Sequence, residues 1–502
     1  MSPILLFLEE TNFLFPTLFL ILLPLLFFTI KHLKTSSLPP GPFPWPILGN
    51  LLQLGKDPLH IALKRFSQTH GPLFRLKLGT QLVVVGSSPA AAIEILKTND
   101  RNLSARYVPE AIPFKSSELN NFSIGWVLEC NESWKHSRML CRSELFSAKA
   151  LGSQASIREK KAMEMLRLVG KREGEMVKIR EFAFATIFNM MSDILVSKDL
   201  LDFEMESING GMSGLLRNLA ELGSTPNVSD LFPVLSQLDL QSLRKRSREV
   251  FERISKIWEA IIKERKDRKI LEDVLGKNDF LDVLIENDFP DNQINILLME
   301  LLSAGTDSSS ITIEWTMTEL IKNPKYMKKV QEELTREIKQ DQLVKESDLP
   351  KLTYLEACVK ESLRLHPPAP IPIPRRASET CQVMNYTIPK NTQVLVNIWE
   401  IGRDPNYWED PLEFKPERFL DSSLDFKGNN YEFLPFSSGR RMCPGISMAA
   451  KQVPLVLASL IHSFDWSLPQ GMEANELDMS ETYDIALLKK QPLLLIPRAK
   501  ML

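Results

Sequence analysis

FLPFSSGRRMCPGISMAA occupies residues 433–450, and it surrounds a cysteine with residues that a buried strand or helix would not normally use. Gly439 lies four residues before Cys443, Arg441 lies two residues before it, and Gly445 lies two residues after it. A free cysteine often serves as a small apolar core residue, but neighbouring arginines, glycines and a proline do not fit that role. The segment instead predicts a site that needs a thiolate, positive charge and close approach of the backbone to a ligand.

The residues that follow the cysteine predict a helix, because the segment Ile446–Leu460 is mostly apolar. Cys443 would then lie near the N-terminus of this helix, where backbone amides and the helix dipole stabilise a thiolate. Gly439 and Gly445 would let the backbone pass close to a flat ligand, and Arg441 would supply charge for its carboxylates. A thiolate beneath a planar dianion describes haem iron with a cysteine axial ligand.

A second segment consists of residues that disfavour the helix predicted to contain it. Apolar residues recur at helical spacing through residues 291–322, yet the middle reads AGTDSSS over Ala304–Ser310. This stretch gives up roughly 3 kcal/mol of helical preference, and its hydroxyl groups can bond back to carbonyls and bend the helix. One interpretation is close packing of another helix on Gly305. The other is a kinked groove in which Asp307 and Ser308 present an acid and an alcohol to a ligand.

Two further patterns combine charged or aromatic residues at helical spacing. Glu361 and Arg364 share one helix face, and Arg418 follows in an irregular stretch, from which it could complete a buried, hydrogen-bonded network. Trp134 and Arg138 lie four residues apart on another predicted helix, where both side chains can donate hydrogen bonds to an anion. Each pattern alone is weak evidence, because such pairs are also common on solvated helix surfaces.

Composition narrows the class of protein. The chain has 502 residues, a net charge of −2 and no basic stripe, so nothing indicates nucleic-acid binding. The five cysteines are widely spaced and form no CxxC pair, which argues against zinc and thioredoxin-type sites. Sparse, unpaired cysteines fit a reducing compartment.

The N-terminus predicts a membrane anchor over residues 1–34. Phe13–Ile30 carries no charge and is just long enough to cross a bilayer. Lysines and a histidine follow it, which predicts that the bulk of the chain faces the cytosol. The alternative is a cleaved secretory signal, but the chain has no basic start and no small-residue cleavage site.

A proline-rich hinge is predicted over residues 35–50, where five prolines occur in the segment Pro39–Pro46. Residues 51–502 then form one domain without a second low-complexity boundary, and their patterns predict a mainly helical α+β body with small sheets. The expected elements are a hairpin over 74–85, a helix from Pro89 through Leu96, helices over 156–168, 240–268, 292–321, 324–339 and 354–365, and strands over 393–396 and 492–496.

Taken together, these motifs resemble those of the cytochrome P-450 superfamily across essentially the whole chain. Phe436-x-x-Gly439-x-Arg441-x-Cys443-x-Gly445 is similar to its haem-binding signature. The other motifs are similar to its oxygen-activating helix (Ala304-Gly305-x-Asp307-Ser308), its structural triad (Glu361-x-x-Arg364 with Arg418) and its propionate-binding helix (Trp134-x-x-x-Arg138). The anchor and the hinge resemble those of the microsomal type, which implies the endoplasmic reticulum membrane.

The resemblance implies a cytochrome P-450 fold around a buried haem b and assigns roles to matching positions. Cys443 would ligate the iron, and Asp307 and Ser308 would relay protons during oxygen activation. Ser308 departs from the usual threonine, so its hydroxyl group is less fixed without the methyl group. The remaining cofactor-binding positions are Trp134, Arg138, Arg375, Phe436, Gly439, Arg441 and Gly445, and the structural triad is Glu361, Arg364 and Arg418.

The implied activity is a monooxygenase reaction that uses O2 and electrons from NADPH. The electrons would come from a membrane-bound NADPH–cytochrome P-450 reductase, because no flavin or nucleotide fingerprint appears in this chain. AGTDSSSITIEW and ETCQVMNYTIPK resemble the plant group that oxidises alkaloids, which includes N-methylcoclaurine hydroxylase, corytuberine synthase and littorine mutase. By this resemblance, a medium-sized apolar substrate would face Ala105–Ile124, Leu215–Leu231, Leu301–Ser308, Ala369–Ile373 and Ile485–Leu487.

Several alternatives stay open at this point. Glu110, Glu118 or Glu221 could pair with a protonated amine of the substrate, or could simply be solvated. The same fold could catalyse oxidative coupling or rearrangement without net hydroxylation. A protein of another class, a membrane haem carrier or sensor, would have no need of the acid–alcohol pair Asp307 and Ser308.

Overall fold

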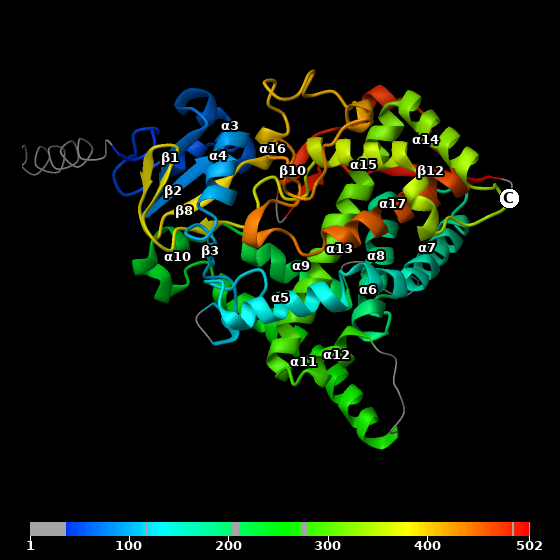
Figure 1. Ribbon diagram of the computed structural model, residues 1–502, viewed down its shortest axis with the longest axis horizontal. Helices are drawn as coiled ribbons and strands as arrows, with labels where there is room; N and C mark the ends of the chain where they lie inside the picture. The colour runs from blue at the N-terminus through cyan, green and yellow to red at the C-terminus, as the bar shows by residue number, and fades with distance from the viewer. Residues whose placement is uncertain (1–36, 116–117, 203–209, 273–278, 484–485, 501–502) are drawn as a thin grey trace, which may run out of the picture.

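The computed structural model describes residues 37–115, 118–202, 210–272, 279–483 and 486–500 (Figure 1). The predicted membrane anchor over residues 1–34 and the first two residues of the predicted hinge lie outside these ranges. Within the described residues, no helix combines the length and the apolar character that a membrane span requires.

Helices form most of the body. The α-helices are α2 (Leu51–Leu54), α3 (Leu59–His70), α4 (Pro89–Ile93), α5 (Glu132–Glu144), α6 (Ala148–Ser153), α7 (Ala155–Gly170), α8 (Ile179–Val196), α9 (Gly211–Ser224), α10 (Val228–Leu231), α11 (Leu243–Glu272), α12 (Phe280–Glu286), α13 (Asp291–Lys322), α14 (Pro324–Glu337), α15 (Thr353–Leu365), α16 (Ile398–Ile401) and α17 (Ile446–Ser463). Short 3-10 turns include Pro416–Phe419 and Gly439–Arg441.

The strands gather into small sheets. They are β1 (Leu73–Leu78), β2 (Gln81–Gly86), β3 (Ala105–Arg106), β4 (Val177–Lys178), β5 (Arg375–Arg376), β6 (Cys381–Val383), β7 (Tyr386–Ile388), β8 (Gln393–Val396), β9 (Phe464–Ser467), β10 (Glu481–Tyr483), β11 (Leu487–Lys489) and β12 (Leu494–Ala499). The largest sheet has the order β1-β2-β8-β5-β3, and its β2–β8 pair is parallel. The β4-β12-β9 sheet and the β6-β7 and β10-β11 hairpins complete the set.

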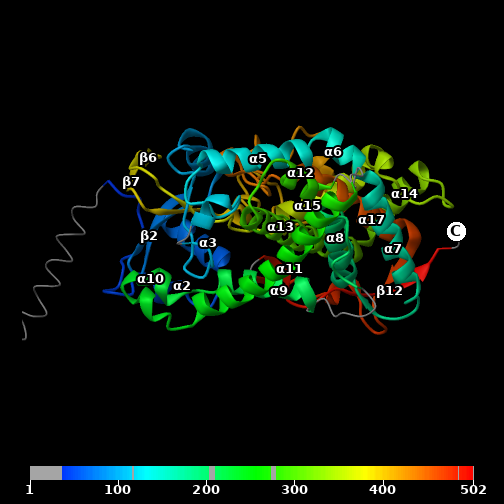
Figure 2. The ribbon, with the colours of Figure 1, turned by 90° about the horizontal axis from the view of Figure 1, so that it is seen from below.

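Two regions can be distinguished in Figure 1. The β1-β2-β8 part of the large sheet lies at one end with α3 and α4, while α7, α8, α14 and α17 lie toward the other end. Helix α13 runs through the middle, and Figure 2 shows it among other helices from the second direction as well. The main apolar core joins residues of α8, α13, α15 and α17, so this central helix is covered by protein along most of its length.

Helix α13 is continuous over Asp291–Lys322, so its polar middle does not interrupt it. A side chain added at Gly305 would meet Met191 of α8 at 2.9 Å, which means that these two helices pack directly at the glycine. Close packing of α8 therefore accounts for Gly305, and the kinked groove that presents Asp307 and Ser308 stays a prediction. Hydroxyl groups do bond back to carbonyls as expected: Thr306 donates to Leu302 and Ser308 donates to Ala304, each over 2.7 Å.

Most expected elements occur close to their predicted bounds, with local differences. The hairpin is β1 and β2 around Gly79-Thr80, and β8 occupies the predicted residues 393–396. The helix expected from Pro89 through Leu96 ends earlier, because α4 stops at Ile93 and a π-helical turn follows over Glu94–Thr98. The last strand lies later than predicted, at Leu494–Ala499, where it pairs with β9.

The described part of the proline-rich hinge contacts the large sheet. Arg75 of β1 donates its backbone N–H to the carbonyl of Pro40 over 2.7 Å, and the backbone N–H of Asn50 donates to the carbonyl of Lys77 over 2.5 Å. A side chain at Gly41 would overlap the carbonyl oxygen of Arg75 at 2.1 Å, so only glycine allows this approach. The segment therefore runs along β1 rather than standing away from the body.

Candidate functional site

The segment around Cys443 is a tight loop that ends in α17. The backbone N–H of Cys443 donates to the carbonyl of Phe436 over 3.1 Å, which closes the loop. Gly439 has a φ of +74°, and a side chain there would lie 2.4 Å from the carbonyl oxygen of Leu96. Gly445 is the N-cap of α17, so Cys443 lies just before the helix, as the sequence predicted.

Cys443 is exposed, yet protein surrounds it closely enough to affect its ionisation. Burial raises the pKa of its thiol above the usual value, while a hydrogen bond from the backbone N–H of Gly445 and the charge of Arg138 act in the opposite direction. The hydrogen bond from Gly445 acts in the direction expected of the helix terminus, and stabilisation of a thiolate by that terminus stays a prediction. Cys443 is therefore accessible to a ligand although the protein around it desolvates its thiol.

Four arginines lie around this loop. Arg138, Arg375 and Arg441 were predicted, and Arg106 of β3 joins them: the guanidinium groups of the other three each act to lower its pKa, after burial itself. Burial and the charges of Arg375 and Arg138 also bring the pKa of Arg441 down to about 10, partly offset by Cys130 and Glu300. The cluster is therefore an electropositive site with strong mutual repulsion.

The protein holds these guanidinium groups mainly with backbone carbonyls. Arg441 donates to Ser104 and Val127, each over 2.8 Å, and Arg375 donates to Ser438 over 2.9 Å. Arg138 donates to Met442, next to the cysteine, over 2.9 Å. Carbonyl dipoles orient the side chains without cancelling their charge, although Asp100 lies 3.4 Å from Arg375. The arrangement leaves positive charge for an anionic ligand.

Trp134 has a different geometry from the one predicted. Its indole N–H donates to the carbonyl of Ile124 over 3.1 Å, so the protein already uses this donor. The ring lies beneath two guanidinium groups, with Arg441 at 4.9 Å and Arg138 at 5.3 Å from its centroid. Trp134 therefore positions the two arginines by cation–π contact, and its direct role toward a propionate stays a prediction.

These residues fit a planar, dianionic group that carries a metal ion. The four arginines supply charge for two carboxylates, and Cys443 supplies one soft ligand atom. At Gly445, the nearest atom that an added side chain would meet is the Cys443 sulfur at 3.9 Å, so protein packing alone does not require glycine there. The aromatic ring of Phe436 packs against Phe426 at 5.4 Å and supports the loop from behind.

Helix α13 carries a partly exposed polar strip in its middle. Ala304 and Ser308 are exposed although they lie in an otherwise buried helix, and Gln452 of α17 donates to the Ser309 hydroxyl over 2.7 Å. Asp307 points elsewhere: its carboxylate lies 3.7 Å from Arg180 of α8 and also feels the charge of Arg217. Burial raises the pKa of Asp307, and these two cations counteract the rise. The predicted acid and alcohol are thus adjacent but have different neighbours.

The predicted triad forms a closed network of its own. Arg364 donates to both oxygens of Glu361, over 2.7 and 2.8 Å, and both side chains are fully buried. Arg418 donates to the same carboxylate over 3.0 Å, and so does the backbone N–H of Lys415 over 2.8 Å. The guanidinium of Arg364 also reaches the carbonyl of Gly402 over 2.6 Å. Such an arrangement holds chain segments together and has no room for a ligand.

The three carboxylates proposed as amine partners are poorly suited to that role. Glu110 is paired with Lys115 at 2.8 Å and lies 3.9 Å from Arg244, while Glu118 and Glu221 are exposed. Sequence reasoning missed Glu300 and Arg106, because neither belongs to a short motif. Both have the loop over residues 123–125 as a partner, a contact that no local pattern reveals.

Comparisons with known proteins agree with the fold and the motifs. The profile of the cytochrome P-450 family matches residues 39–496. A probable (S)-N-methylcoclaurine 3'-hydroxylase isozyme 2 from Coptis japonica is 50% identical over 95% of this chain and 96% of that protein, and corytuberine synthase from the same plant is 46% identical over 95% and 98%. A zebra fish cytochrome P-450 structure with progesterone, 24% identical, shares the fold with a TM-score of 0.75 over 88% of this chain and 100% of that one. The chain belongs to the cytochrome P-450 family of monooxygenases.

Proposed function

We propose that this monooxygenase hydroxylates a medium-sized alkaloid, using O2 and electrons that originate from NADPH. The observation that carries the proposal is the combination of an exposed Cys443, the arginine cluster around it and the polar strip of α13. The substrate class is supported by the relatives of about 50% identity, which are named for N-methylcoclaurine and corytuberine.

The cofactor in this proposal is haem b with Cys443 as the axial ligand. When bound, haem with a thiolate ligand supplies the oxygen-activating chemistry of the reaction. Arg106, Arg138, Arg375 and Arg441 would bind its carboxylates, and Trp134 would hold two of these guanidinium groups in place. Gly439 and Gly445 would let the loop lie flat against the ring, while the Gly445 N–H bonded to the cysteine sulfur would moderate its electron donation.

Ser308 and Asp307 would control protons near the site. The hydroxyl of Ser308 is exposed and donates to the carbonyl of Ala304, so it can exchange that partner for a water or substrate group. Burial raises the pKa of Asp307, and its carboxylate lies 3.7 Å from Arg180 on the side of α8 and α9. A neighbouring acid and alcohol with separate partners can pass a proton by rotation of one side chain.

We also propose that residues 1–34 attach the protein to the endoplasmic reticulum membrane. An apolar surface of the body supports it. Its exposed apolar side chains come from two segments: the hinge with the start of α2, and the residues that come directly after α10. The turn between β1 and β2 joins the two segments, because the Gly79 N–H donates to the carbonyl of Leu48 and the Thr80 N–H donates to the carbonyl of Leu231 at the end of α10. The members of this surface are Phe43, Trp45, Ile47, Leu52, Val234, Leu238 and Leu240, all more than half exposed.

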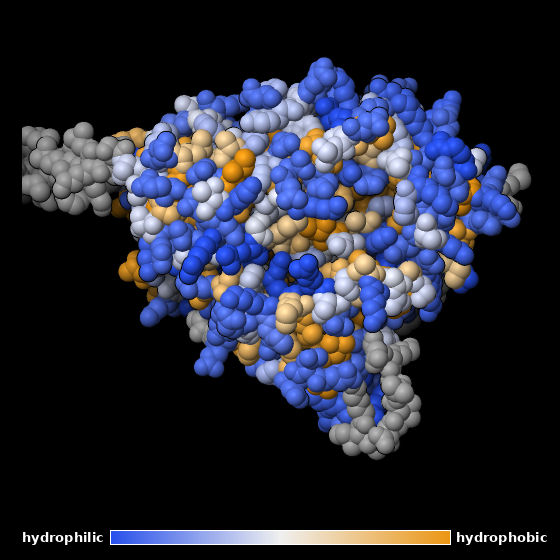
Figure 3. Space-filling view, in the orientation of Figure 1, coloured by the Kyte–Doolittle hydropathy of each residue, from blue (hydrophilic) through white to orange (hydrophobic). Residues whose placement is uncertain are grey.

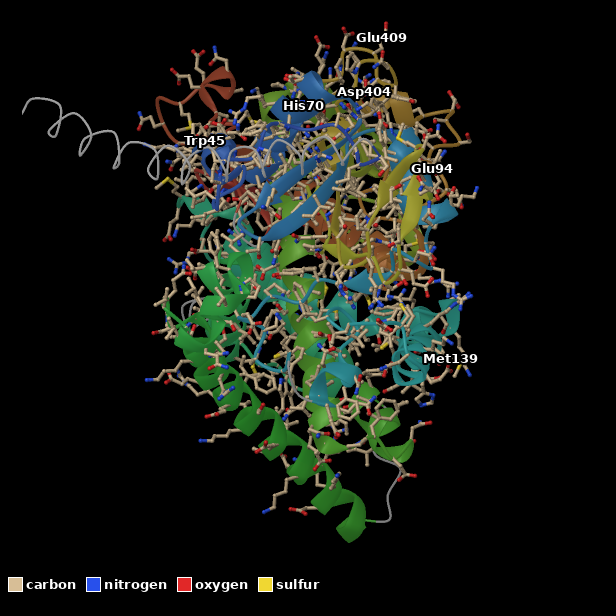
Figure 4. All side chains as sticks on the ribbon, turned by 90° about the vertical axis from the view of Figure 1, so that its left-hand side faces the viewer. Trp45, His70, Glu94, Met139, Asp404 and Glu409 are labelled. Atoms are coloured by element: carbon tan, nitrogen blue, oxygen red, sulfur yellow. The ribbon has the colours of Figure 1, made fainter. Side chains whose placement is uncertain are left out.

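The figures locate this apolar surface at one end of the body. Figures 1 and 2 both place α10 at the end that carries β1 and β2, and Figure 3 shows apolar side chains at that end. In Figure 4, Trp45 lies at the rim of this end, well away from Met139 on α5. Large exposed apolar patches mark contacts with membranes or partners. We infer that the patch around Trp45 contacts lipid, leaving the α5 side free for NADPH–cytochrome P-450 reductase.

Turnover with reductase and NADPH tests the reaction. A panel of benzylisoquinoline and tropane amines should yield at least one product that has gained one oxygen atom. A product that has lost two hydrogen atoms would show oxidative coupling instead, and a product of unchanged mass would show rearrangement. The named relatives include both a hydroxylase and a synthase, so product mass decides between these outcomes.

Two substitutions test the residues. Cys443→Ser should abolish the thiolate signature in the spectrum of the reduced carbon monoxide complex, and retention of that signature would refute the assigned ligand. Asp307→Asn should keep haem and lose most turnover. Unchanged behaviour of Asp307→Asn in every assay would favour a haem carrier or sensor over a monooxygenase.

A further inference from the structure

Glu300 lies on the same face of α13 as the polar strip described above. Residues four apart along a helix share one face, so Glu300, Ala304 and Ser308 form a line. Ala304 and Ser308 are exposed and Glu300 is half-buried, while most of α13 is buried. The carboxylate therefore lies on the same helix face as the hydroxyl of Ser308, and the two residues are about 12 Å apart along the helix axis at 1.5 Å per residue.

Neutral donors hold this carboxylate in place. The Ser123 hydroxyl donates to one oxygen, and the backbone N–H groups of Ile124 and Gly125 donate to the other over 2.7 and 3.2 Å. These dipoles fix the orientation of the side chain but leave its negative charge intact. An ionised carboxylate has about four lone-pair positions for hydrogen bonds, so a further donor can still be accepted.

The negative charge of Glu300 is unfavourable in its buried position, because it has lost contact with water. Burial raises the pKa of this carboxyl group, and the hydrogen bonds and the charge of Arg441 only partly reverse the rise. Arg441 gives its own hydrogen bonds to the carbonyls of Ser104, Ile124 and Val127. Buried carboxylates are usually paired directly, as Glu361 is with Arg364. Glu300 is oriented but not neutralised by the protein.

The space next to Glu300 is bordered by a segment predicted to face the substrate. A side chain built on Gly125 would lie 3.6 Å from an oxygen of Glu300 and 3.9 Å from the terminal carbon of Ile373. Ile373 ends the segment Ala369–Ile373, and its carbonyl accepts a hydrogen bond from Arg106 over 2.6 Å. An anionic group therefore stands beside an apolar wall at one end of the polar strip.

We propose that Glu300 is the carboxylate that binds the protonated amine of the substrate. This inference rests on the proposed oxidation of an alkaloid and names its recognition group, in place of Glu110, Glu118 and Glu221. An ammonium N–H would donate to the free lone pair of the carboxylate, and such charge-assisted bonds are about twice as strong as neutral ones. The rest of the substrate should then extend from Glu300 along the polar strip toward Ser308.

Equilibrium binding to the full-length holoenzyme tests this proposal. The probes are N-methylcoclaurine and a second tertiary benzylisoquinoline amine, each compared with its N-acyl amide, which has nearly the same shape but no charge. Binding is followed both by the haem absorption spectrum and by calorimetry. The wild type should bind each amine at least about 10-fold more tightly than its amide, the range expected for a hydrogen bond to a charged group.

Variants separate charge from structure. Glu300→Gln keeps the size of the side chain, and it should weaken amine binding at least about 10-fold while changing amide binding less than about 3-fold. Glu300→Asp keeps the charge and should retain the preference for the amine. Ser123→Ala is the matched control, because it removes one hydrogen bond to the carboxylate and leaves the charge. Its effect on the amine and on the amide should be equal.

The outcomes are distinct. Equal weakening of amine and amide in Glu300→Gln would show that the carboxylate only supports the loop over 123–125, and would overturn the proposal. A wild type that binds amides as well as amines, or binds neither amine, would also overturn it, whether or not Glu300→Gln folds. Failure of the proposed function is seen separately, as a wild type without the thiolate haem spectrum or without turnover.

Discussion

The molecule contains two sites rich in arginine, and they are built in opposite ways. At the triad, Arg364 and Arg418 converge on the carboxylate of Glu361, and the pair Glu361–Arg364 is fully buried. Around the cysteine loop, guanidinium groups converge on one another, and most of their hydrogen bonds go to backbone carbonyls. The first site has its counter-charge in direct hydrogen-bonding contact, whereas the second has only Asp100, 3.4 Å from Arg375, and the more distant charge of Glu300.

This contrast shows how to tell a structural network from a binding site. Desolvation and mutual repulsion lower the pKa of Arg106 and Arg441, which means that their charged forms destabilise the folded chain. Protein interiors seldom retain such an unfavourable cluster of charges unless a bound ligand of opposite charge offsets it. In the triad, the carboxylate of Glu361 offsets the positive charge of Arg364 and Arg418. The predictions below test the contrast, beginning with the largest effect.

The largest loss of stability should follow Arg364→Met. The substitution leaves Glu361 buried with one partner fewer and removes donors from the carbonyl of Gly402, so the free energy of unfolding should fall by about 3–5 kcal/mol. Denaturant unfolding of the holoenzyme measures it. Arg418→Met is the control, because Arg418 is partly exposed and should cost less. A loss below about 1 kcal/mol for Arg364→Met would contradict a closed, structural site.

Gly439→Ala should come second, at about 3 kcal/mol. An alanine at a φ of +74° costs about 1–2 kcal/mol, and its side chain would also overlap the carbonyl oxygen of Leu96 at 2.4 Å. Gly152→Ala in α6 is the matched control, since nothing lies within 4 Å of the added atom there. It should stabilise the helix by about 0.5–1 kcal/mol. Equal melting temperatures of the two variants would disprove the close approach.

Arg138→Met should change haem release more than it changes stability, which is the opposite of what is expected at the triad. It removes one hydrogen bond, to Met442, so the free energy of unfolding should change by no more than about 1.5 kcal/mol. Loss of a cation from the cluster should nevertheless increase the rate of haem transfer to apomyoglobin about 10-fold. Arg142→Met, exposed on the same helix, should leave that rate unchanged. If both variants release haem at the wild-type rate, the arginine cluster does not hold the cofactor.

The smallest effect is expected at the surface beside the triad. Lys329 and Glu417 form an ion pair of 2.6 Å, with side chains 50% and 41% exposed. Because exposed pairs contribute little, Lys329→Met should change the free energy of unfolding by less than about 1 kcal/mol. Denaturant unfolding with Arg364→Met in parallel gives the comparison directly. A loss approaching that of Arg364→Met would mean that the triad extends to the surface.

Local patterns predicted the parts of this molecule whose partners are close in sequence. The β1–β2 hairpin follows from alternation around Gly79-Thr80, and the Glu361–Arg364 pair follows from helical spacing. The bonding of the Ser308 hydroxyl back to Ala304 follows from the chemistry of one helical turn. In each case the interacting groups are close in sequence, from three residues apart in the Glu361–Arg364 pair to 13 in the hairpin pair Leu73–Gly86, so local patterns were sufficient.

What the sequence could not predict depends on distant segments. Gly305 is explained by Met191, which lies on another helix more than a hundred residues away. Arg106 and Glu300 bind the loop over residues 123–125 through backbone atoms, which carry no sequence signature. The net pKa of Cys443 depends on desolvation by the whole fold. Asp307 and Ser308 were paired by adjacency, and only the packing of α8 separates their neighbours.

The hydroxyl of Ser308 has a consequence for timing. Its present bond to Ala304 is a neutral one, worth about 1 kcal/mol net, and serine has no γ-methyl group to restrict its rotation. Exposed side chains change rotamer within picoseconds to nanoseconds, whereas a typical enzyme turns over about ten times per second. This oxygen atom therefore samples all its orientations many millions of times in each catalytic cycle, and the protein fixes an average position for it and not a single one.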